Sequence, residues 1–283
     1  HAIALEGTFD DCQDMVKSLF NDLEYRDKYN LSAVNSINWA RLLPQIIYYF
    51  WAALALGVPN RKVSFSVPSG NFGNVFSAYA AKALGLPIEN LVVATNTNDI
   101  LSRFFNSGKM EIKQVRPSLS PSMDIQVSSN FERLLFDLCE RDGSLTNEII
   151  ENFRTNGYFD IEMESIATRA NIFSALSVDD ETTLARIKKT HKDTGEIIDP
   201  HSAVGLEAAH QIRSSGSVSP EIPIISLACA HPAKFPDAVH TATGSYPALP
   251  AQLDDLLEKK EYTVVLPNDF DAVSNYIADN TNV

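Results

Sequence analysis

The sequence is poor in cysteine and in long apolar runs. Its three cysteines, Cys12, Cys139 and Cys229, cannot all pair, and no C-x-x-C spacing joins any two of them. Neither a disulfide framework nor a zinc site is therefore expected. No run approaches the ~18–20 apolar residues of a membrane span, and the first residues lack the basic-then-apolar pattern of a signal peptide. These absences predict a cytoplasmic protein without a membrane partner.

Positive charge is also scarce. The 283 residues include 23 Lys and Arg against 36 Asp and Glu, which gives a formal net charge of −13. Nucleic acids and anionic membranes are bound by clustered basic side chains, so the sequence excludes both as expected partners. Any anionic ligand must be held by a local site that works against the overall negative field.

What the sequence does contain is an alternation of strand-like and helix-like segments. A strand at 63–67, a glycine-rich turn and a helix from 75 to 84 come in succession. Further helices are expected at 98–108, 130–141, 145–155, 180–192, 202–214, after His231 and at 269–277, with strands at 91–95, 222–228 and 262–266. This alternation predicts a three-layer α/β fold, with mostly parallel sheets, helices on both faces and ligands at the carboxyl ends of the strands.

The segments before residue 57 also predict a strand followed by helices. A strand at 1–5 leads to Thr8 and Asp11, which have the spacing of a capping box at the start of a helix. A second helix is expected over 35–51, bent at Pro44. Its predicted buried side chains are Ile37, Leu42, Leu43, Ile46, Ile47 and Phe50.

The turn Val67-Pro-Ser-Gly-Asn-Phe-Gly-Asn74 joins a strand to a helix and favours an anion-binding site. Gly70 and Gly73 permit positive φ and close approach of the backbone, and a helix N-terminus presents unpaired N–H groups. The turn has neither the Gly-Lys-Ser/Thr of a triphosphate loop nor the G-x-G-x-x-G of a dinucleotide fold. Taken alone, it fits an ordinary strand-turn-helix corner equally well.

The S-G-N-F-G-N sequence of this turn resembles the phosphate-binding loop of the threonine synthases, which are pyridoxal-phosphate enzymes of the tryptophan-synthase-β-like fold, also called fold type II. Further blocks resemble the same family in order and spacing, over nearly the whole chain. They are Leu5-Glu-Gly-Thr-Phe-Asp-Asp-Cys-Gln13, Asn35-Ser-Ile-Asn-Trp-Ala-Arg41, Ala94-Thr-Asn-Thr-Asn-Asp99, Pro200-His-Ser-Ala-Val-Gly205 and Ala230-His-Pro-Ala-Lys-Phe-Pro236.

The resemblance implies a set of residues that bind pyridoxal 5'-phosphate. The phosphate would lie on Gly70, Asn71, Phe72, Gly73 and Asn74. Many relatives have Asp in place of Asn74, a difference that should not weaken phosphate binding. Cys229 stands where the family usually has a hydroxyl residue facing the pyridine nitrogen, although a free cysteine is more often a small core residue.

The resemblance also implies a second anion site, for the phosphate of the substrate O-phospho-L-homoserine. Its candidates are Asn35, Ser36, Asn38 and Arg41 at a helix entrance, where an ordinary N-cap with one surface arginine is the alternative. The turn at 96–99 and the pair His201–Ser202 are expected either to line the cofactor ring or to cap helices.

One required residue is missing. Covalent catalysis by pyridoxal phosphate needs a lysine for the Schiff base, which the family carries in a Phe-Lys-Asp block, and this sequence has no such block. The resemblance therefore implies a C-terminal portion of the enzyme that works with an upstream segment carrying this lysine. In the family fold, residues 1–56 would end the smaller domain and residues 57–283 would form the large cofactor-binding domain.

The expected activity is that of a threonine synthase, a lyase of threonine biosynthesis that converts O-phospho-L-homoserine and water to L-threonine and phosphate. Two alternatives remain open at this point. A related phospholyase would give a 2-oxo acid from the same phosphate cradle, and a fragment without the lysine would act as a non-catalytic binding protein.

Overall fold

The computed structural model describes residues 1–36 and 38–281, so the predicted burial of Ile37 lies outside the described residues. The chain forms two compact units. The first combines residues 1–34 with 249–283, and the second is continuous from 35 to 248. The first unit is therefore assembled from both ends of the chain.

The first unit is built on two parallel strands from opposite ends of the sequence. Strand β1 (Ala2–Glu6) pairs with β8 (Thr263–Pro267), with Ala2 opposite Thr263. The rest of the unit comprises α1 (Phe9–Asn21), α2 (Leu23–Lys28), the short 3-10 turns Ala251–Leu253 and Leu256–Glu258, and α12 (Phe270–Asn280). The capping box expected at Thr8 and Asp11 is present: each side chain bonds to the other residue's backbone N–H.

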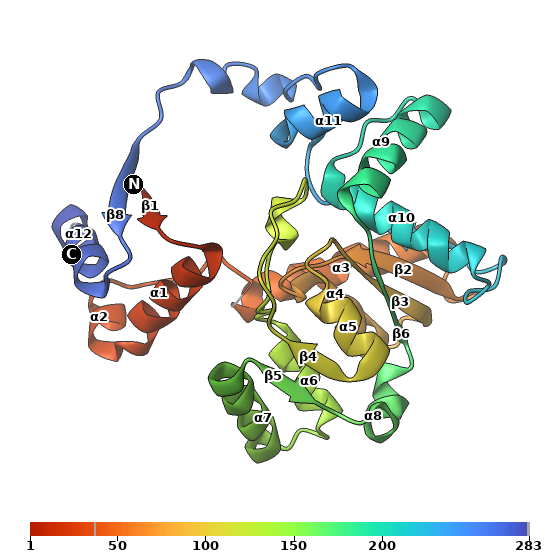
Figure 1. Cartoon of the computed structure of the whole chain (residues 1–283), viewed down its shortest axis with the longest axis horizontal. Helices are drawn as coiled ribbons and strands as arrows, with labels where there is room; N and C mark the ends of the chain where they lie inside the picture. The colour runs from red at the N-terminus through yellow and green to blue at the C-terminus, as the bar shows by residue number, and fades with distance from the viewer. Residues whose placement is uncertain (37, 282–283) are drawn as a thin grey trace. The chain divides into compact units, whose positions relative to one another are not determined.

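The second unit contains the main sheet (Figure 1). Its four parallel strands lie in the order β6 (Phe173–Ser177), β3 (Ile88–Thr95), β2 (Val63–Pro68) and β7 (Ile224–Ser226). The helices are α3 (Trp39–Ala55), α4 (Gly73–Ala83), α5 (Ile100–Ser107), α6 (Phe131–Leu138), α7 (Gly143–Asn156), α8 (Met163–Ala170), α9 (Asp180–Thr194), α10 (Pro200–Ser214) and α11 (Pro236–Thr243). A small antiparallel pair, β4 (Lys109–Glu111) and β5 (Tyr158–Asp160), and the 3-10 turns Pro121–Met123 and Pro232–Lys234 complete it.

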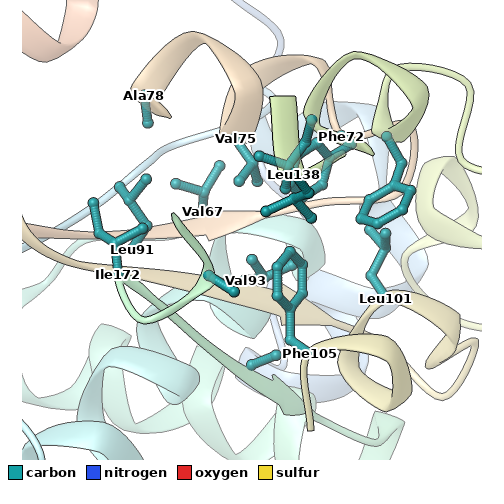
Figure 2. Packing of buried hydrophobic residues seen from close by; sticks show 14 of the residues in the cluster. Val67, Phe72, Val75, Ala78, Leu91, Val93, Leu101, Phe105, Leu138 and Ile172 are labelled. Carbon is teal, nitrogen blue, oxygen red and sulfur yellow. The ribbon is translucent and has the colours of Figure 1, made fainter. Parts of the chain in front are cut away.

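Helices cover both faces of this sheet. Helices α4 and α5 pack on one face, with α3 against α4, whereas α10 packs on the other face and is covered by α9. Figure 2 shows the core on the first face, where Val67, Leu91 and Val93 of the strands meet Val75 of α4 and Phe105 of α5. The expected layered α/β fold with a parallel sheet is therefore present.

The sequence of β2 explains how α10 approaches so closely. Apolar residues alternate with Ser64 and Ser66, and the Ser66 hydroxyl donates to the Gly205 carbonyl in α10 at 2.6 Å. A Cβ on Gly205 would lie 2.6 Å from Cγ of Pro68, so only glycine fits where helix and strand cross. Small residues on this face of the sheet thus bring the start of α10 to the carboxyl edge.

The differences from the sequence predictions that bear on the site concern β6 and α3. Strand β6 was not expected, although Phe173–Ser177 has the short, largely apolar pattern of a buried strand. The helix expected over 35–51 begins at Trp39, because Asn38 caps it. Leu43 and Ile47, predicted to be buried, are exposed, because the side of α3 that packs on α4 carries Leu42, Tyr49 and Ala53 instead.

The compact units also differ from the domain division expected at residue 56. Helix α3 belongs to the second unit because it packs against α4, and residues 249–283 belong to the first unit because β8 pairs with β1. Among the described residues, no helix has the length and apolar character needed to cross a membrane.

Candidate functional site

The glycine-rich turn lies at the carboxyl edge of the main sheet, between β2 and α4. Phe72, not Gly70 or Gly73, adopts the positive φ in this turn, at 63°. A left-handed conformation costs a non-glycine residue about 1–2 kcal/mol. Burying a phenylalanine ring stabilises by about 1.5–3 kcal/mol. The Phe72 ring is 1% exposed and packs against Phe105 and Phe131, so its burial outweighs the strain.

Each glycine is required because of its neighbours rather than its φ. A Cβ on Gly70 would lie 3.1 Å from both Cα of Met123 and the Ser122 carbonyl oxygen. A Cβ on Gly73 would meet side-chain atoms of Leu42, Ser36 and Asn130 at 3.2–3.4 Å. Neither glycine uses the positive φ that it permits, and close approach of the turn's backbone to a phosphate stays a prediction.

The start of α4 has the chemistry of an anion site. Its N-cap is Phe72, whose side chain makes no capping hydrogen bond to the first turn. Uncapped N–H groups at the positive end of a helix dipole favour a phosphate or carboxylate. The structure thus provides a backbone donor set at the position predicted from the sequence.

The turn is fixed from outside by the segment that precedes α6. The Ser128 hydroxyl donates to the Gly70 carbonyl at 2.7 Å, and both the backbone N–H and the side-chain amide of Asn130 donate to the Asn71 carbonyl, at 3.1 and 3.0 Å. Asn71 also accepts from the Ser129 hydroxyl through its side-chain oxygen. With these carbonyls engaged, the turn can direct its N–H groups away from the segment that holds it.

Asn130 also joins the turn to the second predicted anion site. The Asn130 side-chain amide also donates to the Ser36 hydroxyl at 3.1 Å, and this hydroxyl in turn donates to Asn35 at 3.2 Å. Asn38 is the N-cap of α3 and accepts from the Ala40 N–H, while Arg41 is exposed in the first turn of that helix. The structure therefore places Ser36 beside the turn and gives Asn38 the capping role that was the alternative.

Asn74 faces the interior of the second unit. The hydroxyl of Tyr49, which is fully buried in α3, bonds to the Asn74 carbonyl at 2.8 Å and to its side chain. The side-chain oxygen of Asn74 therefore accepts from Tyr49, and the role of its side-chain NH2 group as a ligand donor stays a prediction. Burial, and secondarily the charge of the Cys229 thiolate, raise the pKa of Tyr49 well above its usual value.

Cys229 follows β7 at the same edge of the sheet as the glycine turn, since β7 pairs with β2. The residue as a whole is exposed, which excludes the alternative of a core-filling cysteine. The surrounding protein nevertheless desolvates its thiol and, together with the charge of Asp199, raises the pKa of this thiol to about 12. Cys229 is therefore a neutral, weakly hydrogen-bonding group at the edge of the site.

The backbone around Cys229 is held by the N-cap of α10. Asp199 accepts from the N–H of His201 at 2.9 Å, from the Ser202 hydroxyl and from the Ala230 N–H at 3.2 Å. The Ser202 hydroxyl accepts from the Cys229 N–H at 2.8 Å. Burial opposes ionisation, but hydrogen bonds from His201 and Ser202 prevail and lower the pKa of Asp199.

His201 connects this hydrogen-bond network to the segment that packs against the glycine turn. Its Nδ1 lies 2.9 Å from Asp199, and its Nε2 accepts from the Ser122 N–H at 3.2 Å, which assigns the proton to Nδ1. Ser122 is the residue whose carbonyl packs against Gly70. His201 and Ser202 therefore make hydrogen bonds within the protein at the start of α10. This agrees with the alternative prediction that they belong to a helix start.

The turn after β3 is likewise internal. The side-chain amides of Asn96 and Asn98 both donate to Asp124, at 2.7 and 2.9 Å, and both residues are buried. The Ser118 hydroxyl adds a third bond to the same carboxylate at 2.6 Å. This network fixes the polar span between α5 and α6, and it engages the side-chain amides of Asn96 and Asn98.

Sequence reasoning missed Tyr49, Ser128, Asn130 and Asp199, which position the site. Asn130 and Ser128 were visible only as part of a polar loop before a helix. Asp199 precedes Pro200, a pairing typical of a helix start, which was the available signal. Tyr49 had no signal, because an apolar helix gives no reason to single out one tyrosine.

Proteins of known function are similar to this chain in sequence. Over 283 residues the chain is 49% identical to the threonine synthase of Pseudomonas aeruginosa, a match that covers 100% of this chain and 60% of the relative. The chain is therefore similar to threonine synthases over its whole length. The threonine synthase of Saccharomyces cerevisiae is 40% identical over 301 residues, covering 98% of this chain and 58% of the relative. The family described as "Threonine synthase, C-terminal" matches residues 202–277.

Solved threonine synthases share the fold. The crystal structure of PLP-bound threonine synthase from Brucella melitensis superposes with a TM-score of 0.89 at 48% identity, covering 100% of this chain and 60% of that one. A processed threonine deaminase of Solanum lycopersicum, 12% identical with a TM-score of 0.50, shares the fold alone. These likenesses confirm the expected fold type II. The chain spans about 60% of the length of the threonine synthases it matches.

Proposed function

We propose that this chain is the cofactor-holding and substrate-binding portion of a threonine synthase, which converts O-phospho-L-homoserine and water to L-threonine and phosphate. The observation that carries this proposal is the uncapped start of α4 behind a fixed glycine turn, in a chain 49% identical to a threonine synthase. Similarity to threonine synthases over the whole chain favours the synthase reaction over release of a 2-oxo acid.

The residues present fit pyridoxal phosphate. Backbone N–H groups at the start of α4 suit a phosphate dianion, and Gly70 and Gly73 leave no side chain between the turn and its neighbours. Cys229, neutral at the same sheet edge, suits a pyridine nitrogen as a weak partner. When bound, the cofactor would supply an electron sink for the elimination and addition steps.

The chain's own residues would bind and orient the substrate. Ser36, already bonded to Asn130 beside the turn, would help hold the substrate phosphate, with Asn35 and Arg41 at the same entrance. Asn38 would act indirectly, by capping α3 and so fixing the position of this entrance. The three free cysteines support a reducing compartment, and the cytoplasm is part of this proposal.

The partner in this proposal is an upstream segment that carries the Schiff-base lysine. The test compares the 1–283 chain with a chimera in which the part of the P. aeruginosa relative that precedes the matched region is joined ahead of His1. We expect the chain alone to form no specific borohydride-fixable adduct with pyridoxal phosphate and no threonine, and the chimera to do both. A stoichiometric adduct on a lysine of this chain, located by peptide mass, would contradict the proposal. Formation of a 2-oxo acid by the chimera would replace the synthase by a phospholyase.

Cys229 provides a second prediction. In the chimera, Cys229→Thr is expected to keep or tighten cofactor binding, because a hydroxyl is a stronger hydrogen-bonding group than a neutral thiol. Cys229→Leu is expected to weaken it about tenfold, because the larger side chain overfills the space at the ring. Absorbance titration with pyridoxal phosphate measures both. Equal affinity of all three proteins would remove Cys229 from the site.

A further inference from the structure

Asn130 lies where the two proposed anion sites meet. Its side chain is buried, and its amide nitrogen donates to the Asn71 carbonyl of the glycine turn at 3.0 Å and to the Ser36 hydroxyl at 3.1 Å. A Cβ on Gly73 would lie 3.3 Å from Cβ of Ser36 and 3.4 Å from Nδ2 of Asn130, so both side chains lie against the first residue of α4. The proposed sites for the substrate phosphate and the cofactor phosphate are therefore adjacent.

Arg133 is bonded to the other polar atom of this asparagine side chain. Its Nε donates to Oδ1 of Asn130 at 3.1 Å, and its guanidinium carbon lies over the Trp39 ring, 5.5 Å from the centroid. That ring packs edge-on against Phe76 of α4. Burial lowers the pKa of Arg133 although the charge of Glu132 opposes this effect, so the guanidinium is partly removed from water. The position of Arg133 is thus set by an amide and by an aromatic face.

Two phosphates that lie side by side require positive charge between or beside them. Each carries close to two negative charges near neutral pH, and the chain as a whole has a net charge of −13. The segments that meet here, residues 35–41 and 128–133, contain two basic residues, Arg41 and Arg133. Arg41 is exposed, so water and salt screen its charge, whereas Arg133 is partly buried and is screened less. Arg133 is therefore the better placed of the two to offset the charge of the phosphates.

We propose that Arg133 is a specificity-determining residue of the second anion site, where its guanidinium stabilises the phosphate group of the substrate beside Ser36. A guanidinium has five N–H donors in one plane, and the bond to Asn130 uses one of them. By bonding to Oδ1, the cation also strengthens the two N–H donors of Asn130 that hold Ser36 and the glycine turn. The ligand class selected in this way is a phosphorylated amino acid. The inference rests on the proposed function and adds a residue to its substrate site.

The test compares a ligand that is a phosphate with one that has none, at equilibrium and without turnover. Inorganic phosphate and L-threonine are titrated by calorimetry into the chimera loaded with pyridoxal phosphate. We expect Arg133→Gln to weaken the binding of phosphate by about tenfold or more, because a charge-assisted interaction is lost, and to leave the affinity for L-threonine unchanged. Arg133→Lys, which keeps the charge but not the planar fork, should weaken phosphate binding less. Cofactor content after gel filtration should be the same in all these proteins.

Two further arginine variants serve as references. Arg154→Gln on α7 is the matched control, because Arg154 pairs with Glu151 on an exposed helix surface, and it should change neither affinity. Arg41→Gln should weaken phosphate binding less than Arg133→Gln does, because Arg41 is exposed.

Three outcomes would overturn the proposal. Phosphate binding that is absent from the parent chimera, or unchanged in Arg133→Gln, would remove Arg133 from an anion site. Equal weakening of phosphate and L-threonine would give Arg133 a merely structural role, and loss of the cofactor would place it at the cofactor phosphate instead. A chimera that makes no threonine but binds phosphate in an Arg133-dependent manner would contradict the proposed reaction while supporting the anion site.

Discussion

Replacing Asp199 by alanine is expected to lower the free energy of unfolding of the second unit by about 3–5 kcal/mol. The carboxylate is fully buried and accepts from the backbone and ring of His201, from Ser202 and from the Ala230 N–H. Removing a buried, ionised acceptor leaves several donors unsatisfied, which costs about 3–5 kcal/mol in comparable sites. Urea unfolding followed by circular dichroism measures the loss.

A matched control is Asp179→Ala at the exposed N-cap of α9, where the aspartate side chain accepts from the Thr182 N–H. Loss of such a cap costs about 1 kcal/mol. Equal effects of the two substitutions would contradict the role given to the buried network.

The pH dependence follows from the lowered pKa of Asp199, which its hydrogen bonds produce against the opposing effect of burial. An aspartate in the unfolded chain titrates near ~3.9. The stabilisation by Asp199 is therefore complete above that pH and is lost as the pH falls through the lower pKa of the folded state. We expect the Asp199→Ala variant to lose less stability than the parent on acidification below pH ~4.

The second large effect is expected at the glycine turn. Gly70→Val should reduce retention of pyridoxal phosphate in the chimera by at least about a hundredfold, because its Cβ would press on backbone atoms of Ser122 and Met123. Backbone cannot yield as a flexible side chain can, and overpacking of this kind also costs about 1–3 kcal/mol of stability. Cofactor content after gel filtration, measured by absorbance, gives the result.

Gly73→Val is expected to have the smaller effect of the two, because its Cβ would meet only side-chain atoms of Leu42, Ser36 and Asn130. Gly143→Val at the start of α7 serves as the control, since no atom lies within 4 Å of its added Cβ. Undiminished cofactor content in both loop variants would remove the turn from the site.

The parts of the fold that follow from local chemistry were predictable. Alternating Val, Phe and Ser in β2, the glycine turn and the Thr8 capping box each carry their own signal, and the structure contains all three. The location of the proposed anion site follows too, because the carboxyl edge of a parallel sheet is fixed by strand direction.

The remaining features depend on contacts between distant segments. Periodicity identified α3 as apolar but could not decide which of two apolar sides faces α4, so Leu43 and Ile47 were assigned to the wrong side. The positive φ belongs to Phe72 because Phe105 and Phe131, far along the chain, receive its ring. Asn130 joins the turn to Ser36, which precedes it by 94 residues, and no local sequence pattern predicts such a hydrogen bond.

The pairing of β1 with β8 has a consequence for the order in which the chain folds during synthesis. Among the described strands, β1 pairs with β8 alone, so this pairing waits until residue 263 has left the ribosome, whereas residues 35–248 are by then complete and continuous. Contacts between such distant residues form late, since closing a long loop is entropically costly and domains fold as units while the chain emerges. Strand β1 therefore waits for this partner until the second unit has been translated, so the first unit is completed only after β8 has been made.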